Sequence, residues 1–224
     1  MRWKIYKRFF FFILGSLFWL GCQTPQTVSS SKPGDEGLDL RSRVHKIILD
    51  NGLTILMLRR EGAPVFSAQI KVRVGSIEEE QGSSGLAHFF EHMAFKGTNK
   101  IGTPDYAQEK AILDQIFVIG TQIAQMKKEG KPASAWADLL KQRQALEAAE
   151  KKYITKNEFT QIFQVNGGSN LNSTTSNDFT TYYVSLPSNK LELWAYLESE
   201  RFLHSVLREF FTEVDVVAEE LIKK

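Results

Sequence analysis

The sequence predicts an α+β protein in which three strands open the folded region and a further strand lies between helical segments. Two β-rich runs flank Asp50-Asn51-Gly52 in "VHKIILDNGLTILMLRR", and Asn-Gly is a strong signal for a tight hairpin. Alternating apolar residues in "PVFSAQIKVRVGS" predict a third strand with one buried face. From Tyr106 onwards, apolar residues recur every three or four positions, which is the period of a helix.

Length and charge exclude some protein classes. With 224 residues, 42% of them hydrophobic, the chain can build the core of one domain or of two small ones. Its formal charge of +2 depends on four basic residues at the N-terminus, which are Arg2, Lys4, Lys7 and Arg8. Without these four, 24 basic side chains face 26 acidic ones. The rest of the chain therefore lacks a basic excess, and we expect no nucleic-acid partner.

The N-terminus has the pattern of a signal peptide. A basic head precedes an apolar run over residues 9–21, and thirteen residues are too few to span a bilayer, which needs about 20. The single cysteine, Cys22, follows directly, in a position that resembles the lipobox of bacterial lipoproteins. That resemblance implies a lipid on Cys22 and a membrane anchor in the bacterial cell envelope, on the periplasmic side or at the cell surface. An ordinary signal peptide or a short uncleaved anchor are the alternatives.

Three segments with different expected roles follow from this pattern. We expect residues 1–21 to form the signal peptide, and residues 22–42, rich in Ser, Thr, Pro and Gly, to form a flexible tether. Residues 43–224 then form the folded domain. Within it, residues 106–156 predict a helical hairpin broken at Gly130 and Pro132, with Ser134 as the N-cap of the second helix.

The remainder of the domain alternates loop, strand and helix. A polar loop over residues 166–178 precedes a β-rich run over residues 179–186. Two amphipathic helices are expected afterwards, marked by Leu191 to Phe202 and by Phe210 to Leu221.

The segment "GLAHFFEHMAFKGT" carries the chemistry. Two of the four histidines in the chain, His88 and His92, lie four residues apart on a predicted helix that begins near residues 83–84 and ends near Gly97. Side chains at i and i+4 share one face, so both imidazoles can bind one ion. Glu91 borders that face and can serve as a general base for a water that the metal activates. A helix whose histidines only fill space is the alternative interpretation.

An acidic third ligand is the natural complement to two histidines. Catalytic zinc sites combine three protein ligands with an open position. The last predicted helix offers Glu213, Glu219 and Glu220, and Glu213 and Glu220 share a face because they are seven residues apart. Spacing alone leaves the choice among them open.

Several ordered motifs resemble peptidase family M16, the inverted zincins related to insulysin, pitrilysin and mitochondrial processing peptidase. They are "LDNGLTILM", the H-x-x-E-H segment, "GGSNLNSTTSNDFTTYY" and "LREFFTEVDVVAEEL". The resemblance implies a mainly antiparallel sheet with helices on one face, as in the N-terminal catalytic half of that family. It also implies a zinc-dependent endopeptidase that hydrolyses peptide bonds.

The resemblance assigns roles residue by residue. His88, His92 and Glu220 match the ligands of one Zn²⁺ per chain, and Glu91 matches the catalytic general base. Glu213 matches an acidic position that orients the site. Asn172 matches an edge-strand position that hydrogen-bonds a peptide substrate, although Asn serves equally well in a turn.

The sequence also departs from the family. The 127 residues between His92 and Glu220 exceed the usual family spacing by about the size of the helical hairpin, which indicates an insertion. The chain ends at Lys224, inside the second ligand helix, so we expect the domain to be incomplete at its C-terminus.

Two other functions stay open at this point. One is a non-catalytic or truncated subunit that acts only with a second M16-like half or chain. The other is a lyase of the S-ribosylhomocysteine-cleaving kind, which also shows H-x-x-E-H but needs a cysteine ligand. The single cysteine of this chain lies in the leader, which argues against the lyase.

Overall fold

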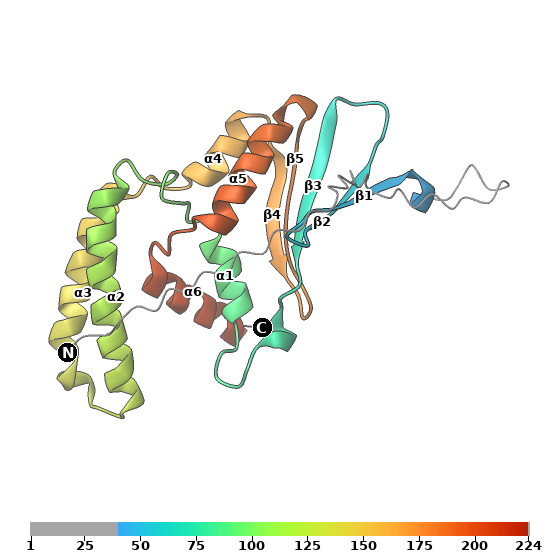
Figure 1. Cartoon of the computed structure of the whole chain (residues 1–224). Coiled ribbons are helices and arrows are strands. Elements are labelled where there is room, and N and C mark those ends of the chain that lie inside the picture. Colours follow the sequence, from blue (N-terminus) through green and yellow to red (C-terminus); the bar gives the residue numbers. More distant parts are fainter. Residues whose placement is uncertain (1–39, 224) are drawn as a thin grey trace, which may run out of the picture. The chain divides into compact units, whose positions relative to one another are not determined.

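The larger of two antiparallel sheets has the strand order β3-β5-β4 in the computed structural model of the chain, which describes residues 40–223 (Figure 1). Its strands are β3 (Val65–Val72), β5 (Thr180–Pro187) and β4 (Ser169–Thr175). β5 pairs with both neighbours, so β3 and β4 form the edges among the described strands. The mixed architecture is α+β, as the sequence predicts.

The chain divides into two compact units, one up to Gly62 and one from Ala63 to Lys224. The described part of the first unit contains the short helix η1 (Leu40–Arg43) and a hairpin of β1 (Val44–Ile48) and β2 (Thr54–Leu58). Gly52 takes a φ of 86° in the turn, and the Asn51 side chain accepts a hydrogen bond from the Leu53 amide at 3.0 Å. The Asn-Gly signal therefore predicts the turn correctly, with glycine alone supplying the positive φ. The predicted signal peptide and nearly all of the tether lie outside the described residues.

Six α-helices belong to the described part of the second unit, together with short 3₁₀ turns. They are α1 (Leu86–Met93), α2 (Tyr106–Lys128), α3 (Ala137–Glu150), α4 (Glu158–Val165), α5 (Leu191–Leu203) and α6 (Phe210–Lys223). Within the described residues, no helix is both long enough and apolar enough to cross a bilayer.

One hydrophobic core joins the larger sheet to two helices. Phe159 and Phe163 of α4 and Leu197 of α5 pack with Val184 and Leu186 of β5. Both helices lie on the same side of the sheet (Figure 1). From Tyr182 onwards the buried positions of β5 alternate along the strand, because successive side chains of a strand point to opposite faces.

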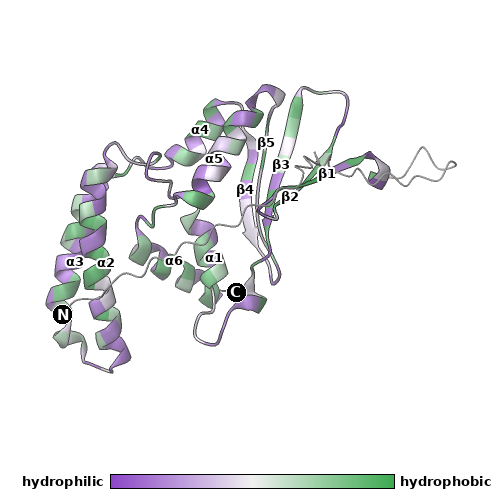
Figure 2. Cartoon of the chain, viewed as in Figure 1, coloured by the Kyte–Doolittle hydropathy of each residue, from purple (hydrophilic) through white to green (hydrophobic). Residues whose placement is uncertain are grey.

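A second core joins α1 to α6. Phe89 and Met93 of α1 are buried against Val217 of α6, with Phe210 packed at the edge. Hydrophobic residues recur along α1 and along the hairpin helices α2 and α3 (Figure 2). This small core holds together the two helices that carry the candidate site residues.

Several local expectations differ from the structure. Ser134 is not the N-cap of α3, because it lies inside the 3₁₀ turn η3 (Ala133–Ala135) and the N-cap residue is Trp136. Helix α3 ends at Glu150, followed by the 3₁₀ turn η4 (Lys151–Tyr153), so the hairpin ends before residue 156. Helix α4 was not expected, because its first turn follows Asn157 at a φ of 58° and it spans only eight residues. Strand β4 lies where polar, turn-type residues predict a loop, since pairing with β5 overrides the local preference.

Glu150 is a buried carboxyl at the end of α3. Burial and the nearby carboxylate of Glu109 raise the pKa of Glu150 to about 7 from an ordinary 4.5. Its Oε1 atom is buried and makes no hydrogen bond. The folded chain therefore binds this proton more tightly than the unfolded chain does. Stability is unaffected below about pH 4.5 and falls as the pH rises through 7.

We therefore expect Glu150→Gln to raise the free energy of unfolding at pH 8 by up to about 3 kcal/mol, with little effect near pH 4.5. Urea denaturation across this pH range measures the difference. Asp138→Asn, at an exposed position of the same helix, is the control and should give a flat difference. A Glu150→Gln gain that does not change with pH would contradict the raised pKa.

Candidate functional site

Helix α1 is anchored at its N-terminus by a carboxylate from outside the helix. Glu79 accepts hydrogen bonds from the backbone amides of Gly85 and Ala87, each at 2.8 Å. These amides have no partner inside the helix, and a negative charge at this end also complements the helix dipole. Gly85 has a φ of 90°, and a Cβ there would lie 2.5 Å from Leu221 of α6. The sequence predicts a start near residues 83–84, whereas α1 begins at Leu86, with Glu79 as the acceptor at this end.

The segment before α1 is also tied to the larger sheet. Ser76 and Ile77 donate backbone hydrogen bonds to Ser176 and Asn177, which lie in the turn between β4 and β5. A Cβ at Gly75 would overlap the backbone of that turn. The start of α1 is thus connected to the end of β4 by a short, tightly fitted segment.

His88 and His92 lie one turn apart on α1 with ring centroids 4.7 Å from each other. The Oε2 atom of Glu220 on α6 lies 2.9 Å from Nε2 of His88 and 3.9 Å from Nε2 of His92. One donor atom from each of the three residues lies within 4.8 Å of the others, and no other group of three such residues does so in the part of the chain that is described.

This donor set fits a zinc ion. Tetrahedral ligands at about 2.0–2.2 Å from Zn²⁺ lie about 3.4 Å from one another, and the measured separations of 2.9 and 3.9 Å bracket that value. Two imidazoles and one carboxylate are also a ligand combination that catalytic zinc uses.

Glu91 is buried beside this group. Its carboxylate accepts a hydrogen bond from the Thr175 hydroxyl at the end of β4, and it lies 3.5 Å from Nδ1 of His88. The contact fixes one carboxylate oxygen of Glu91. Sequence reasoning missed Thr175, because a threonine 84 residues away carries no local signal.

Glu213 contacts the other side of the site. Its Oε2 atom lies 3.2 Å from Nδ1 of His92, so a proton on that nitrogen would leave Nε2 free to face Glu220. Lys96 donates to both Glu213 and Glu209. Burial opposes ionisation of Glu213, but the hydrogen bonds from Lys96 and His92 outweigh it and lower the pKa of Glu213 below its ordinary value.

Asn172 lies on β4, which is an edge strand among the described strands. It pairs with Tyr183 of β5, and its side-chain oxygen accepts a hydrogen bond from the Ser173 amide. The edge position agrees with what the family resemblance implies. The described contacts do not assign it a ligand.

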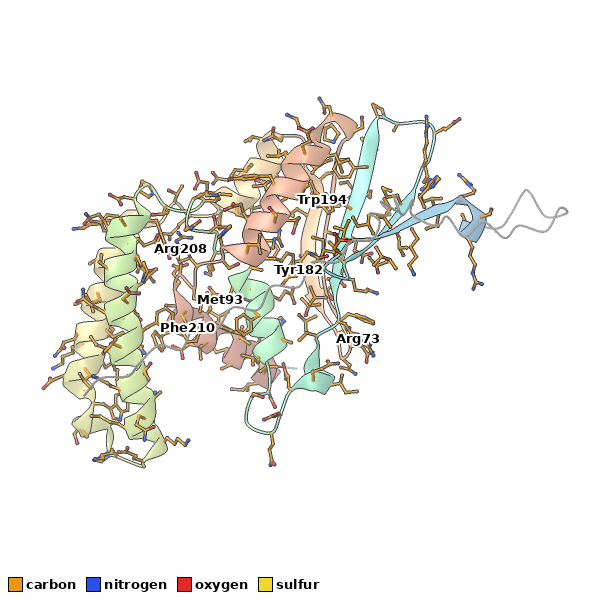
Figure 3. The ribbon with its side chains drawn as sticks, in the orientation of Figure 1. Arg73, Met93, Tyr182, Trp194, Arg208 and Phe210 are labelled. Carbon is orange, nitrogen blue, oxygen red and sulfur yellow. The ribbon has the colours of Figure 1, made fainter. Side chains whose placement is uncertain are left out.

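A buried arginine fixes the chain just before α6. Arg208 is fully buried, and its guanidinium donates to both carboxylate oxygens of Glu109 on α2. It also donates to the backbone carbonyls of Lys96, Thr98 and Ile101, at 2.7–3.2 Å. The arginine joins the segment after α1, the start of α2 and the start of α6, and Figure 3 labels it beside the elements that it connects.

Known proteins resemble both the sequence and the fold. The family model described as Insulinase (Peptidase family M16) matches residues 54–113, which include His88, Glu91 and His92. The stromal processing peptidase of Arabidopsis thaliana is 39% identical over 82 residues, which are 36% of this chain and 5% of that protein. Over residues 54–113 the chain is therefore similar to peptidase family M16.

Other proteins match segments of comparable length. An uncharacterized zinc protease of Rickettsia bellii is 43% identical to this chain over 61 residues, which are 27% of the chain and 15% of the relative. The chain thus spans a small part of the length of the curated relatives that it matches.

Two solved structures share the fold of this chain. A protease from Helicobacter pylori gives a TM-score of 0.52 at 24% identity, covering 79% of this chain and 30% of that one. The periplasmic protease PqqL from Escherichia coli gives 0.50 at 22% identity, covering 83% and 15%. At this identity the likeness establishes the α+β fold.

The role of Glu79 can be tested by stability. Glu79→Ala removes the acceptor of two amides at the start of α1, and we expect it to lower the free energy of unfolding by about 1–2 kcal/mol. The neighbouring Glu80→Ala, at an exposed position, is the control and should stay within about 0.5 kcal/mol. Equal losses in the two variants, measured by urea denaturation, would remove Glu79 from the capping role.

Proposed function

We propose that the chain is a zinc-dependent endopeptidase with one Zn²⁺ held by His88, His92 and Glu220. The observation that carries this proposal is the convergence of two imidazoles from α1 and one carboxylate from α6 within 4.8 Å. When bound, zinc lowers the pKa of a water molecule to about 7 and polarises a carbonyl oxygen. The match of residues 54–113 to the M16 family model and relatives named as proteases support the same chemistry.

Glu91 is the proposed general base. Its buried carboxylate, held by Thr175, lies close enough to His88 to reach a water molecule at the site. Glu91 takes a proton from the attacking water and then gives it to the leaving amine. No covalent bond between enzyme and substrate is needed.

Neighbouring side chains orient the proposed ligands and balance their charge. Glu213 orients the His92 ring through Nδ1, and Lys96 offsets the charge that Glu213 brings into the site. The exposed edge of β4 offers backbone groups with which an extended peptide can pair, and Asn172 lies on that edge. Such pairing tolerates many substrate side chains because the backbone makes the bonds.

The proposed ligands predict a defined zinc content. The purified chain should contain one zinc per molecule by elemental analysis, and the double variant His88→Ala/His92→Ala should contain none. His204→Ala is the matched control, because His204 contacts Glu200 away from the site, and it should keep the metal. A folded chain without zinc, or zinc that survives the double substitution, would exclude this site.

Substitution of Glu91 should affect hydrolysis without affecting zinc binding. Glu91→Gln should keep about one zinc and lose peptide hydrolysis by a factor of at least about 10². Elemental analysis and cleavage of a quenched fluorescent peptide measure the two effects in parallel. Hydrolysis that persists in Glu91→Gln would remove Glu91 from its role.

A second candidate function is a subunit that acts only with a partner M16-like half or chain. Exposed apolar side chains favour it. Leu86 and Phe90 of α1 and Phe202 of α5 are each about half exposed and line a groove of about 840 Å³. Contiguous apolar surface of this kind is typical of a face that another segment covers. Peptide cleavage that needs an added M16-like half would favour this candidate over an enzyme active alone.

The membrane anchor is a further part of the proposal. Cys22 lies outside the described residues, and its position after the apolar run supports lipidation and attachment to the bacterial envelope. Mass spectrometry of the mature N-terminus tests it, since an unmodified or absent Cys22 would remove the lipid anchor.

A further inference from the structure

The hairpin α2–α3 supplies none of the candidate site residues, yet three of its residues contact the first turn of α6. The Phe117 ring lies 5.3 Å from Phe210 and 6.1 Å from Phe211, measured between centroids. The Arg143 guanidinium lies 4.5 Å from the centroid of the Phe211 ring. The three hairpin residues that make this contact are Phe117, Arg143 and Gly120.

Gly120 is the point of closest approach. It is buried in the middle of α2, and a Cβ at this position would overlap the ring of Phe211. Glycine weakens the interior of a helix compared with alanine. Its presence where Phe211 meets α2 therefore fits a contact that requires the absence of a side chain.

The contact continues into the helix that carries the histidines. The Phe210 ring lies 5.0 Å from Phe89 of α1, with the rings edge to face. Phe89 follows His88 directly, and Glu213 lies three residues, almost one turn, after Phe210. Three aromatic rings thus connect the hairpin to α6 and α6 to α1, and Figure 3 labels Phe210 between these helices.

Helix α6 has little other cover. Val217 is its one buried residue among those described, whereas Val214, Val216, Leu221 and Ile222 are exposed. The direction of α6, and with it the position of Glu220, therefore depends strongly on how its first turn is held.

We propose that the hairpin α2–α3 positions the second ligand helix of the site. Phe211, placed between Gly120 and Arg143, sets where Glu213 and Glu220 lie relative to His92 and His88. Phe211 and Gly120 are positioning residues that do not touch the metal or the substrate. The metal-binding consequence rests on the proposed function, whereas the contact between Glu213 and His92 does not.

Gly120→Val in the full chain tests the proposal. The added side chain should displace Phe211 and rotate α6. In the metal-free chain, the nitrogen and proton NMR signals of His92 should then lose the features of a hydrogen bond from Nδ1 to Glu213. Zinc affinity, measured by competition with a chelator, should fall about ten- to a hundredfold, as for other losses of outer support.

Two matched variants separate positioning from general damage to α2. Ala124→Val adds bulk at an exposed position of the same helix, and it should leave both measurements unchanged. Gly120→Val/Phe211→Ala removes the ring that the valine displaces, and it should restore part of the His92 signal and of the zinc affinity. Should Gly120→Val fail to fold, Phe211→Leu, which keeps an apolar group but loses the ring contacts, should give the same two losses at smaller size.

The outcomes are distinct. His92 signals and zinc affinity that stay unchanged in folded Gly120→Val, or that change equally in Ala124→Val, overturn the positioning role. If the unaltered chain binds no zinc, the proposed function fails, and the metal-free NMR signals still decide whether the hairpin positions α6.

Discussion

The buried ion pair between Arg208 and Glu109 fixes how α1, α2 and α6 are arranged in the second unit. A guanidinium is costly to bury unless all its donors are satisfied, and here the carboxylate of Glu109 and three backbone carbonyls accept from it. Those carbonyls belong to the segment that leaves α1. Gly97 and Gly102 lie so close to Arg208 that a Cβ on either would come within 3.0–3.1 Å of the guanidinium. Loss of one partner would leave the other charge buried, so this junction specifies a single arrangement of α1, α2 and α6.

The candidate site depends on that junction because its ligands come from two separate helices. His88 and His92 are fixed relative to each other by the geometry of one helix, whatever happens elsewhere. Glu220 and Glu213 reach them only if α6 lies correctly against α1. The small α1–α6 core, the Arg208 junction and the aromatic contacts to the hairpin all act on this single relation. These three sets of contacts therefore all help to place α6 against α1.

Local patterns predicted some parts of this molecule well and others poorly. The Asn-Gly hairpin, the β3 alternation and the H-x-x-E-H face follow from short-range geometry, so they can be predicted without a structure. Strand β4 has a polar sequence and becomes a strand only through pairing with β5. Thr175, Glu79, Lys96 and Arg208 contact the site or its helices across long separations in sequence, for which no spacing rule exists. Spacing also could not choose between Glu213 and Glu220, whereas in the structure the two carboxylates face different nitrogens of His92.

The short segment between β3 and α1 links the β4 edge, where we propose that a peptide binds, to the helix that carries the proposed metal ligands. Its backbone is hydrogen-bonded to the β4–β5 turn at one end, and Glu79 holds the first amides of α1 at the other. Thr175, the last residue of β4, also holds Glu91. An extended chain that adds to the β4 edge therefore acts on a strand that is joined to α1 at two places. A change in the twist of β4 would therefore tilt α1 and move the Glu91 carboxylate. Binding of a chain at the β4 edge and the position of Glu91 are thus coupled.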